Sequence, residues 1–325
     1  MLTVQEASVL IREKKMLLLA GSEQALEQLP PGNWIGGTTA YFMTKGGGVV
    51  DKERVFATEL GPPIVSIGVK SYGGDDLEAL PKDYPEHGCS FVILPASSQP
   101  HLRLAARGAA LPGLFDGALV GWVAGCHLDE LGSAEPKVFD GTTLQRFSDR
   151  AVVMHADVDA GFVAKVDILN PFEQGTGDVI TFPDGGFEVE RCSINGEPAN
   201  FAEYLERAAI DTQLPLVANF GGALVNVSFQ GVEKERKRVK FYAPVFEGVE
   251  YRLASQLEDY AAEFERQLAQ RKDTPMFACN CILNFLYAKL EGRSTGEVTG
   301  PITFGEIAYI LLNQTLVYVT FDKTA

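Results

Sequence analysis

The sequence is poor in the side chains that build metal centres and disulfide frameworks. Its 325 residues include only five cysteines and four histidines. No two cysteines form a CxxC pair, and no two histidines have the i, i+4 spacing of a helical metal site. These absences argue against a zinc ribbon, a thioredoxin-like redox motif and a helical zinc site. We therefore expect reduced cysteines and no metal centre.

Basic residues are also scarce. Lysine and arginine number 28 against 43 acidic residues, which gives a formal net charge of −15. Such a surface repels phosphate, so we expect neither a nucleic-acid partner nor docking on an anionic membrane.

Long apolar runs are missing as well. The N-terminal residues lack the apolar core of a signal peptide, and the most apolar stretch, residues 109–127, is interrupted by Pro112, Asp116 and four glycines. This favours buried strand and turn over a membrane span. A cytoplasmic protein is the simplest interpretation.

What the chain does contain is many short strand-like runs. Their alternation, β-branched residues and flanking glycines indicate strands. Helical spacing appears at fewer places: residues 2–15, 22–28, 98–111, 200–210, 250–272 and 282–291. Strands and helices do not alternate regularly, so a doubly wound sheet is not expected. We predict an α+β fold with two sheet-containing halves, mostly antiparallel or mixed strands, and helices packed on them. The expected domains are residues 1–187 and 188–325.

Glycine-rich segments at residues 34–40 and 46–48 invite a nucleotide-binding interpretation. The first contains Thr38 and Thr39 but lacks the lysine of a Walker loop and the spacing of GxGxxG. The alternative is that these glycines permit close backbone packing at a strand end.

Cys279 and Asn280 lie where a predicted strand gives way to a helix. A thiol at such a turn is either reactive, with a lowered pKa, or a small buried hydrophobe. As a nucleophile, Cys279 would need a histidine base, and the sequence offers His155 or His127 without a local motif that links either to it.

Near the C-terminus, Glu306 falls inside an apolar run. Its carboxylate is on the solvent face, buried with partners, or held ready for a ligand. The polar triplet of residues 313–315, which begins with Asn313, separates two apolar runs. It forms either a hairpin turn or a set of polar groups directed into a cleft.

Several of these motifs together resemble the FIST family of bacterial and eukaryotic sensory proteins. The matching segments follow the family's order along the chain: residues 35–40, 193–199 with Tyr204, 241–248, 276–280, 305–307 and 313–316. Family members often place glycine and arginine after the cysteine strand, where this chain has Cys281 and Ile282. A ligand role carried by that arginine would be absent here.

The resemblance implies a FIST N-like domain followed by a FIST C-like domain, and a non-enzymatic sensor of a small polar metabolite, with amino acids suggested as ligands. The expected ligand-binding residues are Thr38, Thr39, Cys279, Asn280, Glu306 and Asn313. In this hypothesis Glu306 receives an ammonium group and Asn313 a carboxylate or amide.

No length remains for an output domain, so the expected partner is a separate signalling protein such as a kinase or cyclase. No cofactor is expected in this interpretation. Three alternatives stay open: a haem-based nitric oxide sensor, a thiol-dependent hydrolase that uses Cys279, and a scaffold with a vestigial pocket.

Overall fold

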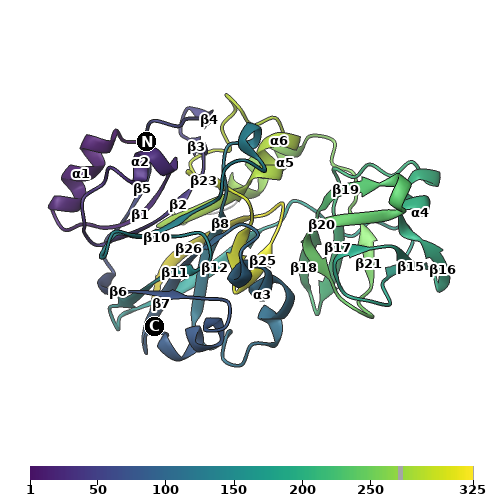
Figure 1. The fold of residues 1–325 in the computed structure, drawn as a ribbon, viewed down its shortest axis with the longest axis horizontal. Helices are drawn as coiled ribbons and strands as arrows, with labels where there is room; N and C mark the ends of the chain where they lie inside the picture. Colours follow the sequence, from purple (N-terminus) through teal and green to yellow (C-terminus); the bar gives the residue numbers. More distant parts are fainter. Residues whose placement is uncertain (270–273, 325) are drawn as a thin grey trace.

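The computed structural model describes residues 1–269 and 274–324 and has two lobes of unequal size (Figure 1). Strands dominate and short helices cover parts of the sheets. Among the described strands, β1 with β2, β7 with β8 and β22 with β23 pair in parallel, and the other pairs are antiparallel. The predicted α+β class with mixed sheets is confirmed.

The larger lobe contains three sheets. The first has the strand order β10 (Gln145–Phe147), β9 (Val138–Asp140), β2 (Trp34–Thr38), β1 (Met16–Gly21) and β5 (Phe56–Leu60). The second has the order β25 (Ile310–Leu312), β24 (Glu306–Ala308), β8 (Ala118–Ala124), β7 (Gly88–Pro95), β11 (Ala151–Val158) and β6 (Ile64–Tyr72). The third has the order β12 (Phe162–Leu169), β26 (Leu316–Lys323), β22 (Phe277–Cys281), β23 (Gly300–Thr303), β3 (Tyr41–Thr44) and β4 (Gly47–Val50).

Short helices flank these sheets. They are α1 (Val4–Arg12), α2 (Glu23–Leu26), η1 (Leu77–Asp83), α3 (Gln99–Arg107), η2 (Gly108–Ala110), η3 (Leu128–Glu130), α5 (Tyr260–Ala269) and α6 (Ile282–Tyr287). Their starts follow local capping chemistry: Thr3 and Glu6 form a capping box at α1, and the Ser98 hydroxyl accepts from the His101 N–H at α3.

The core of the larger lobe lies where the three sheets meet. Ile35 comes from the first sheet, Phe91 and Trp122 from the second, and Phe277 and Val317 from the third, and all are buried in one cluster. The Trp122 and Phe277 rings stack with centroids 5.5 Å apart. Burial of each such side chain contributes about 1.5–3 kcal/mol, so this cluster holds the sheets together.

C-terminal strands complete sheets begun by N-terminal ones. β23 pairs with β3, β24 with β8, and β26 with β12. The expected division between residues 187 and 188 therefore does not separate the sheets. Strands from both sides of it share two sheets of the larger lobe, and it falls inside the strand Gly186–Val189.

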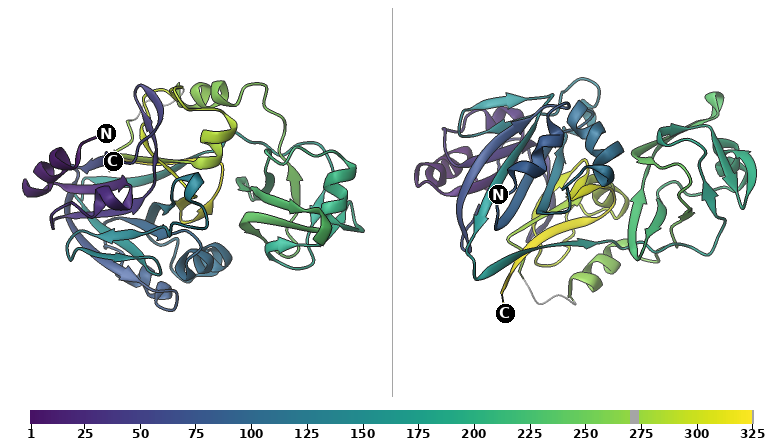
Figure 2. Two further views of the ribbon diagram at one scale, coloured as in Figure 1. Left: turned by 45° about the horizontal axis from the view of Figure 1, so that its top comes forward. Right: turned by 90° about the horizontal axis from the view of Figure 1, so that it is seen from below.

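The smaller lobe is an insertion that leaves the larger lobe after β12 and returns before α5 (Figure 2). One sheet has the order β16 (Glu197–Asn200), β15 (Arg191–Ile194), β13 (Ile180–Thr181), β21 (Tyr251–Leu253), β17 (Leu216–Phe220) and β18 (Ala223–Val227). The other has the order β14 (Gly186–Val189), β20 (Arg238–Val245) and β19 (Phe229–Glu233), and the lobe also contains α4 (Phe201–Arg207) and η4 (Lys234–Arg236). Phe182, Phe201, Phe229, Phe241 and Tyr251 form its buried aromatic core.

The predicted helix over residues 250–272 is wrong over residues 250–259. Tyr251–Leu253 is the strand β21, which pairs with β17, and α5 begins only at Tyr260. The Tyr251 ring packs against Phe182 at 5.7 Å, and its hydroxyl accepts from the Phe246 N–H at 2.9 Å. These contacts in the smaller lobe override the helical spacing. The last predicted residues, 270–272, lie outside the described residues.

No helix in the described ranges is both long and apolar enough to cross a bilayer.

Candidate functional site

A cleft of about 650 Å³ lies between the two lobes. The larger lobe contributes the start of α3, the segment 126–136 and the start of α6, and the smaller lobe contributes residues of β14 and β20. This volume is within the range of small-molecule sites, which occur preferentially where lobes or domains meet.

The wall of the cleft is largely apolar and includes large side chains that water reaches. Leu102, Leu131, Tyr242 and Leu286 line it with 37–59% of their surface exposed. Phe304 also contributes to the wall. Exposed apolar groups gathered around a concave site are typical of a binding surface.

Asn313 is the expected ligand-binding residue that the structure places in this cleft. Its side chain is 1% exposed, and its Nδ2 donates to the Leu312 carbonyl at 3.0 Å. A carbonyl only accepts, so this bond fixes the orientation of the amide. The Oδ1 atom has no hydrogen-bond partner among the described residues. A buried acceptor left free at a cleft wall is a natural contact for a ligand donor.

Glu306 lies on β24, fully buried. The Thr315 N–H and hydroxyl donate to its Oε2 at 3.2 and 2.8 Å, whereas Oε1 has no hydrogen-bond partner among the described residues. Burial raises the pKa of this carboxyl to about 8, against the smaller lowering effects of Thr315 and of the Cys281 thiol. At neutral pH the neutral acid dominates, so the structure does not favour the expected role as an ammonium acceptor.

Cys281, which was not among the expected site residues, lines the cleft beside Glu306. It is the N-cap residue of α6. The N–H groups of Leu283 and Gln314 interact with its sulfur, yet burial and the nearby Glu306 raise the pKa of the thiol above its ordinary value. The cysteine that sequence reasoning favoured, Cys279, is buried in the core and donates to the Gly121 carbonyl at 3.3 Å.

Asn280 supports the turn from β22 into α6. Its Oδ1 accepts from the Cys281 N–H at 2.8 Å and from the Asn284 amide at 2.7 Å, and its Nδ2 has no partner among the described residues. It is not a lining residue of the cleft.

Thr38 and Thr39 line a separate pocket of about 250 Å³. The Thr38 hydroxyl accepts from the Lys137 N–H, and the Thr39 hydroxyl donates to the Ile302 carbonyl. This pocket shares Cys126, Ala134 and Glu135 with the cleft. The six expected residues therefore do not converge on one site: Asn313 faces the cleft, Glu306 lies beside the cleft residue Cys281, and the two threonines face the neighbouring pocket.

The polar triplet joins the two lobes. Asn226 on β18 donates to the Asn313 carbonyl at 3.1 Å, and the Ser228 hydroxyl donates to the Gln314 side chain at 2.6 Å. Thr315 binds Glu306 in the larger lobe. Residues 313–315 therefore present a free acceptor to the cleft and also form a seam between the lobes. Nothing in the local sequence indicated this second role.

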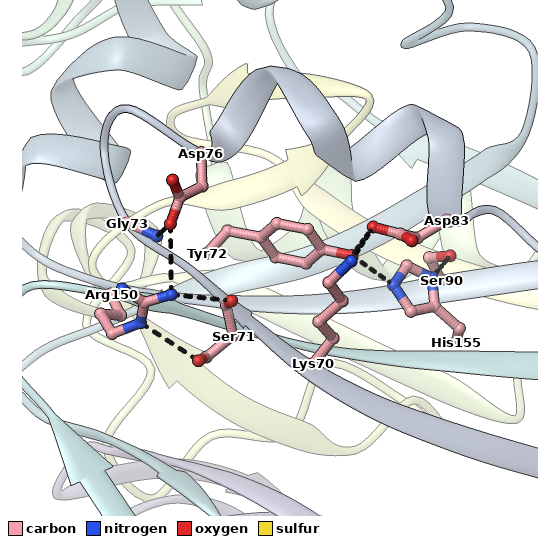
Figure 3. A network of polar contacts seen from close by, with 9 residues as sticks. All are labelled: Lys70, Ser71, Tyr72, Gly73, Asp76, Asp83, Ser90, Arg150 and His155. Carbon is pink, nitrogen blue, oxygen red and sulfur yellow. Dashed lines mark hydrogen bonds and ion pairs between the residues drawn. The ribbon is translucent and has the colours of Figure 1, made fainter.

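A second polar network lies on the outer face of the second sheet (Figure 3). Tyr72 donates to Asp83 at 2.8 Å, and Lys70 bonds the same carboxylate at 2.6 Å. The Tyr72 oxygen accepts from His155 Nε2 at 2.9 Å, which leaves Nδ1 to accept from Ser90 at 2.8 Å. Burial lowers the pKa of His155 to about 4, so the ring is neutral.

This network contains the serine, histidine and aspartate of a catalytic triad, but Tyr72 lies between His155 and Asp83 and the serine is buried. Ser90 is 0% exposed on β7, where no substrate can reach it. His155 is engaged by Ser90 and Tyr72, and His127 accepts from the Asp129 N–H. Neither histidine is placed as a base for Cys279. In the described ranges, no three histidine, cysteine or acidic side chains cluster as a metal site.

Comparison with known proteins places the chain in a family without assigning an activity. A model of the family of unknown function DUF6976 matches residues 2–322, so the chain belongs to that family. A probable germin-like protein, subfamily 2 member 5, of Arabidopsis thaliana is 28% identical over 179 residues, covering 52% of this chain and 78% of that protein. This likeness does not place the chain among the germin-like proteins.

Proposed function

We propose that this protein is a cytoplasmic sensor that binds a small molecule in the cleft between its lobes and signals to a separate protein. The observation that carries the proposal is the free Oδ1 of Asn313, buried at the wall of a cleft with exposed apolar side chains. A buried polar atom without a partner costs free energy, and a ligand that donates to it recovers that cost.

The signal would travel through the seam. Asn313 and Gln314 contact Asn226 and Ser228 of the smaller lobe. A ligand that binds Asn313 would therefore contact the segment that links the two lobes, and could change their relative position. Small-angle X-ray scattering with and without ligand measures that position, and an unchanged radius of gyration would remove this part of the proposal. Membership of the FIST family, which the sequence motifs suggest, would place this protein among sensory proteins.

A thermal-shift screen of small metabolites tests the binding proposal. A ligand at a hundredfold excess over its dissociation constant stabilises the native state by about 2.7 kcal/mol. Ala134→Trp, at an exposed lining position, should fill the cleft and abolish the shift. The matched control is Ala109→Trp, at an exposed position of η2 outside the cleft lining, which should retain it. A shift that survives Ala134→Trp would place binding elsewhere.

A thiol-dependent activity is the second candidate, and its nucleophile would be Cys281 rather than Cys279. Cys281 lines the cleft, and the N–H groups of Leu283 and Gln314 favour its thiolate. Glu306 lies beside it and accepts a proton only above its own pKa of about 8. Native protein treated with iodoacetamide should then gain one carbamidomethyl group that Cys281→Ser lacks and Cys279→Ser keeps. Absence of labelling up to pH 9 would exclude this candidate.

A further inference from the structure

The charges around the cleft restrict what it can hold. Among the described residues, Glu135 and Glu188 are the charged ones that line it, and no described lysine or arginine does. Arg238 and Lys240 form ion pairs with Glu188, which neutralise it. Glu135 is exposed, and no ion pair is found for it within the described residues. The cleft therefore offers one free negative charge and no positive side chain to balance an anion.

The backbone at the two helix starts gives an anion little support. At the start of α3, the Ser98 hydroxyl accepts from the His101 N–H, and Pro100 has no N–H to offer. At the start of α6, Cys281 makes no side-chain capping bond, and the helix has only six residues. A helix this short contributes only a weak dipole towards a carboxylate or phosphate.

Two polar groups of the cleft have fixed roles, an acceptor on Asn313 and a neutral N–H donor on His101. The bond from Asn313 Nδ2 to the Leu312 carbonyl leaves Oδ1 as an acceptor. His101 accepts from the Ser97 N–H through Nδ1, so the neutral ring carries its proton on Nε2. Burial keeps this ring neutral, because it lowers the pKa of His101 to about 4. Neither residue supplies a positive charge.

Resting on the function proposed above, we infer that the cleft takes small organic amines with an apolar or aromatic body, and not the corresponding amino or carboxylic acids. The ammonium group donates to Asn313 Oδ1, and the apolar body lies against Leu102, Tyr242 and Leu286. Glu135 raises the local concentration of cations at the mouth. An amino acid presents a carboxylate that no lysine or arginine of the described cleft lining can neutralise, and its desolvation disfavours binding.

Three matched probes test the inference by titration calorimetry in phosphate buffer, which avoids the amine of Tris: phenethylamine, phenylalanine and hydrocinnamate. They share a benzyl group and differ in charge. We expect phenethylamine to bind about tenfold or more tightly than either acid, the ratio that one unpaired charged group gives.

Three variants test where phenethylamine binds and whether Glu135 contributes to its affinity. Glu135→Gln should weaken phenethylamine binding about threefold and reduce its salt dependence. Glu197→Gln, at an exposed position of β16, is the matched control and should change neither. Ala134→Trp should abolish amine binding.

The outcomes separate the two claims. Binding of hydrocinnamate or phenylalanine that equals or exceeds that of the amine, and that Ala134→Trp removes, overturns the amine preference. It leaves binding at the cleft or at the adjoining pocket that Ala134 also lines. Amine binding that Ala134→Trp does not affect overturns both. Lack of binding by phenethylamine overturns the inference, and the wider screen above then decides the function.

Discussion

Two buried polar regions of the larger lobe differ in how completely their atoms are paired. In the network of Figure 3, a continuous chain of hydrogen bonds joins Ser90, His155, Tyr72 and Asp83. Near the cleft, by contrast, Glu306 Oε1 and Asn313 Oδ1 have no hydrogen-bond partner among the described residues. A paired network stabilises the fold, whereas unpaired buried atoms cost stability and are retained where a ligand uses them.

The largest expected effect is the loss of folding stability at alkaline pH, which arises from Glu306 near the cleft and not from the paired network. The pKa of Glu306 in the folded protein, about 8, is above the ordinary 4.5. The native state therefore binds more protons than the unfolded state in this window, and wild-type stability falls as pH rises from about 4.5 to about 8. Glu306→Gln imitates the neutral acid. At pH 8.5 we expect it to exceed the wild type by about 3 kcal/mol in urea unfolding, with near equality at pH 5.

The control for that comparison is Glu53→Gln, an exposed carboxylate whose stability curve should follow the wild type. Parallel curves for Glu306→Gln and the wild type from pH 5 to 8.5 would show that the Glu306 carboxyl is not held neutral by burial.

The paired network should respond to acid instead. The pKa of His155, about 4, is below its ordinary 6.5. The unfolded state then binds more protons, so stability is complete above about pH 6.5 and is lost as pH falls towards 4. We expect this ring to contribute about 2 kcal/mol of that loss. The pH slope of urea unfolding should be shallower for His155→Gln, and an unchanged slope would contradict the neutral ring.

A smaller effect should follow from removing one hydroxyl of the network. Tyr72→Phe removes one hydrogen bond from Asp83 and one from His155, so we expect a loss of about 1–2 kcal/mol in the free energy of unfolding. Tyr309→Phe, at a half-buried position of the same lobe, should cost less than about 0.5 kcal/mol. Equal costs for the two variants would indicate that the network does not stabilise the fold.

Much of the fold could be predicted from local pattern. The strands Met16–Gly21, Ala118–Ala124, Phe162–Leu169, Leu216–Phe220 and Arg238–Val245 each consist of an apolar alternation or a buried apolar run that turn residues bound. A turn inside an apolar run gives no such signal. The run 305–312 is two strands that reverse at Tyr309, which has a φ of 65°.

The candidate site was less predictable because it depends on long-range contacts. That Asn313 faces the cleft depends on β24 pairing with β8, and on an insertion between β12 and α5 that supplies the opposite wall. Cys281 is separated from Cys279 by one residue, yet it reaches the cleft because it is the cap of α6, whereas Cys279 remains in the core. No local signal distinguishes the two thiols.

The central claim is that Asn313 is kept unpaired for a ligand, and a comparison of two asparagines tests it most directly. Asn284 is also buried, but its amide donates to Asn280 and Thr315 and accepts from Tyr260. Without ligand, Asn284→Ala should cost about 2–3 kcal/mol and Asn313→Ala less than about 1 kcal/mol. Wild-type protein should bind phenethylamine in a calorimetric titration, and Asn313→Ala should not. A strongly destabilised Asn313→Ala variant, or one that binds the amine as the wild type does, would contradict the account.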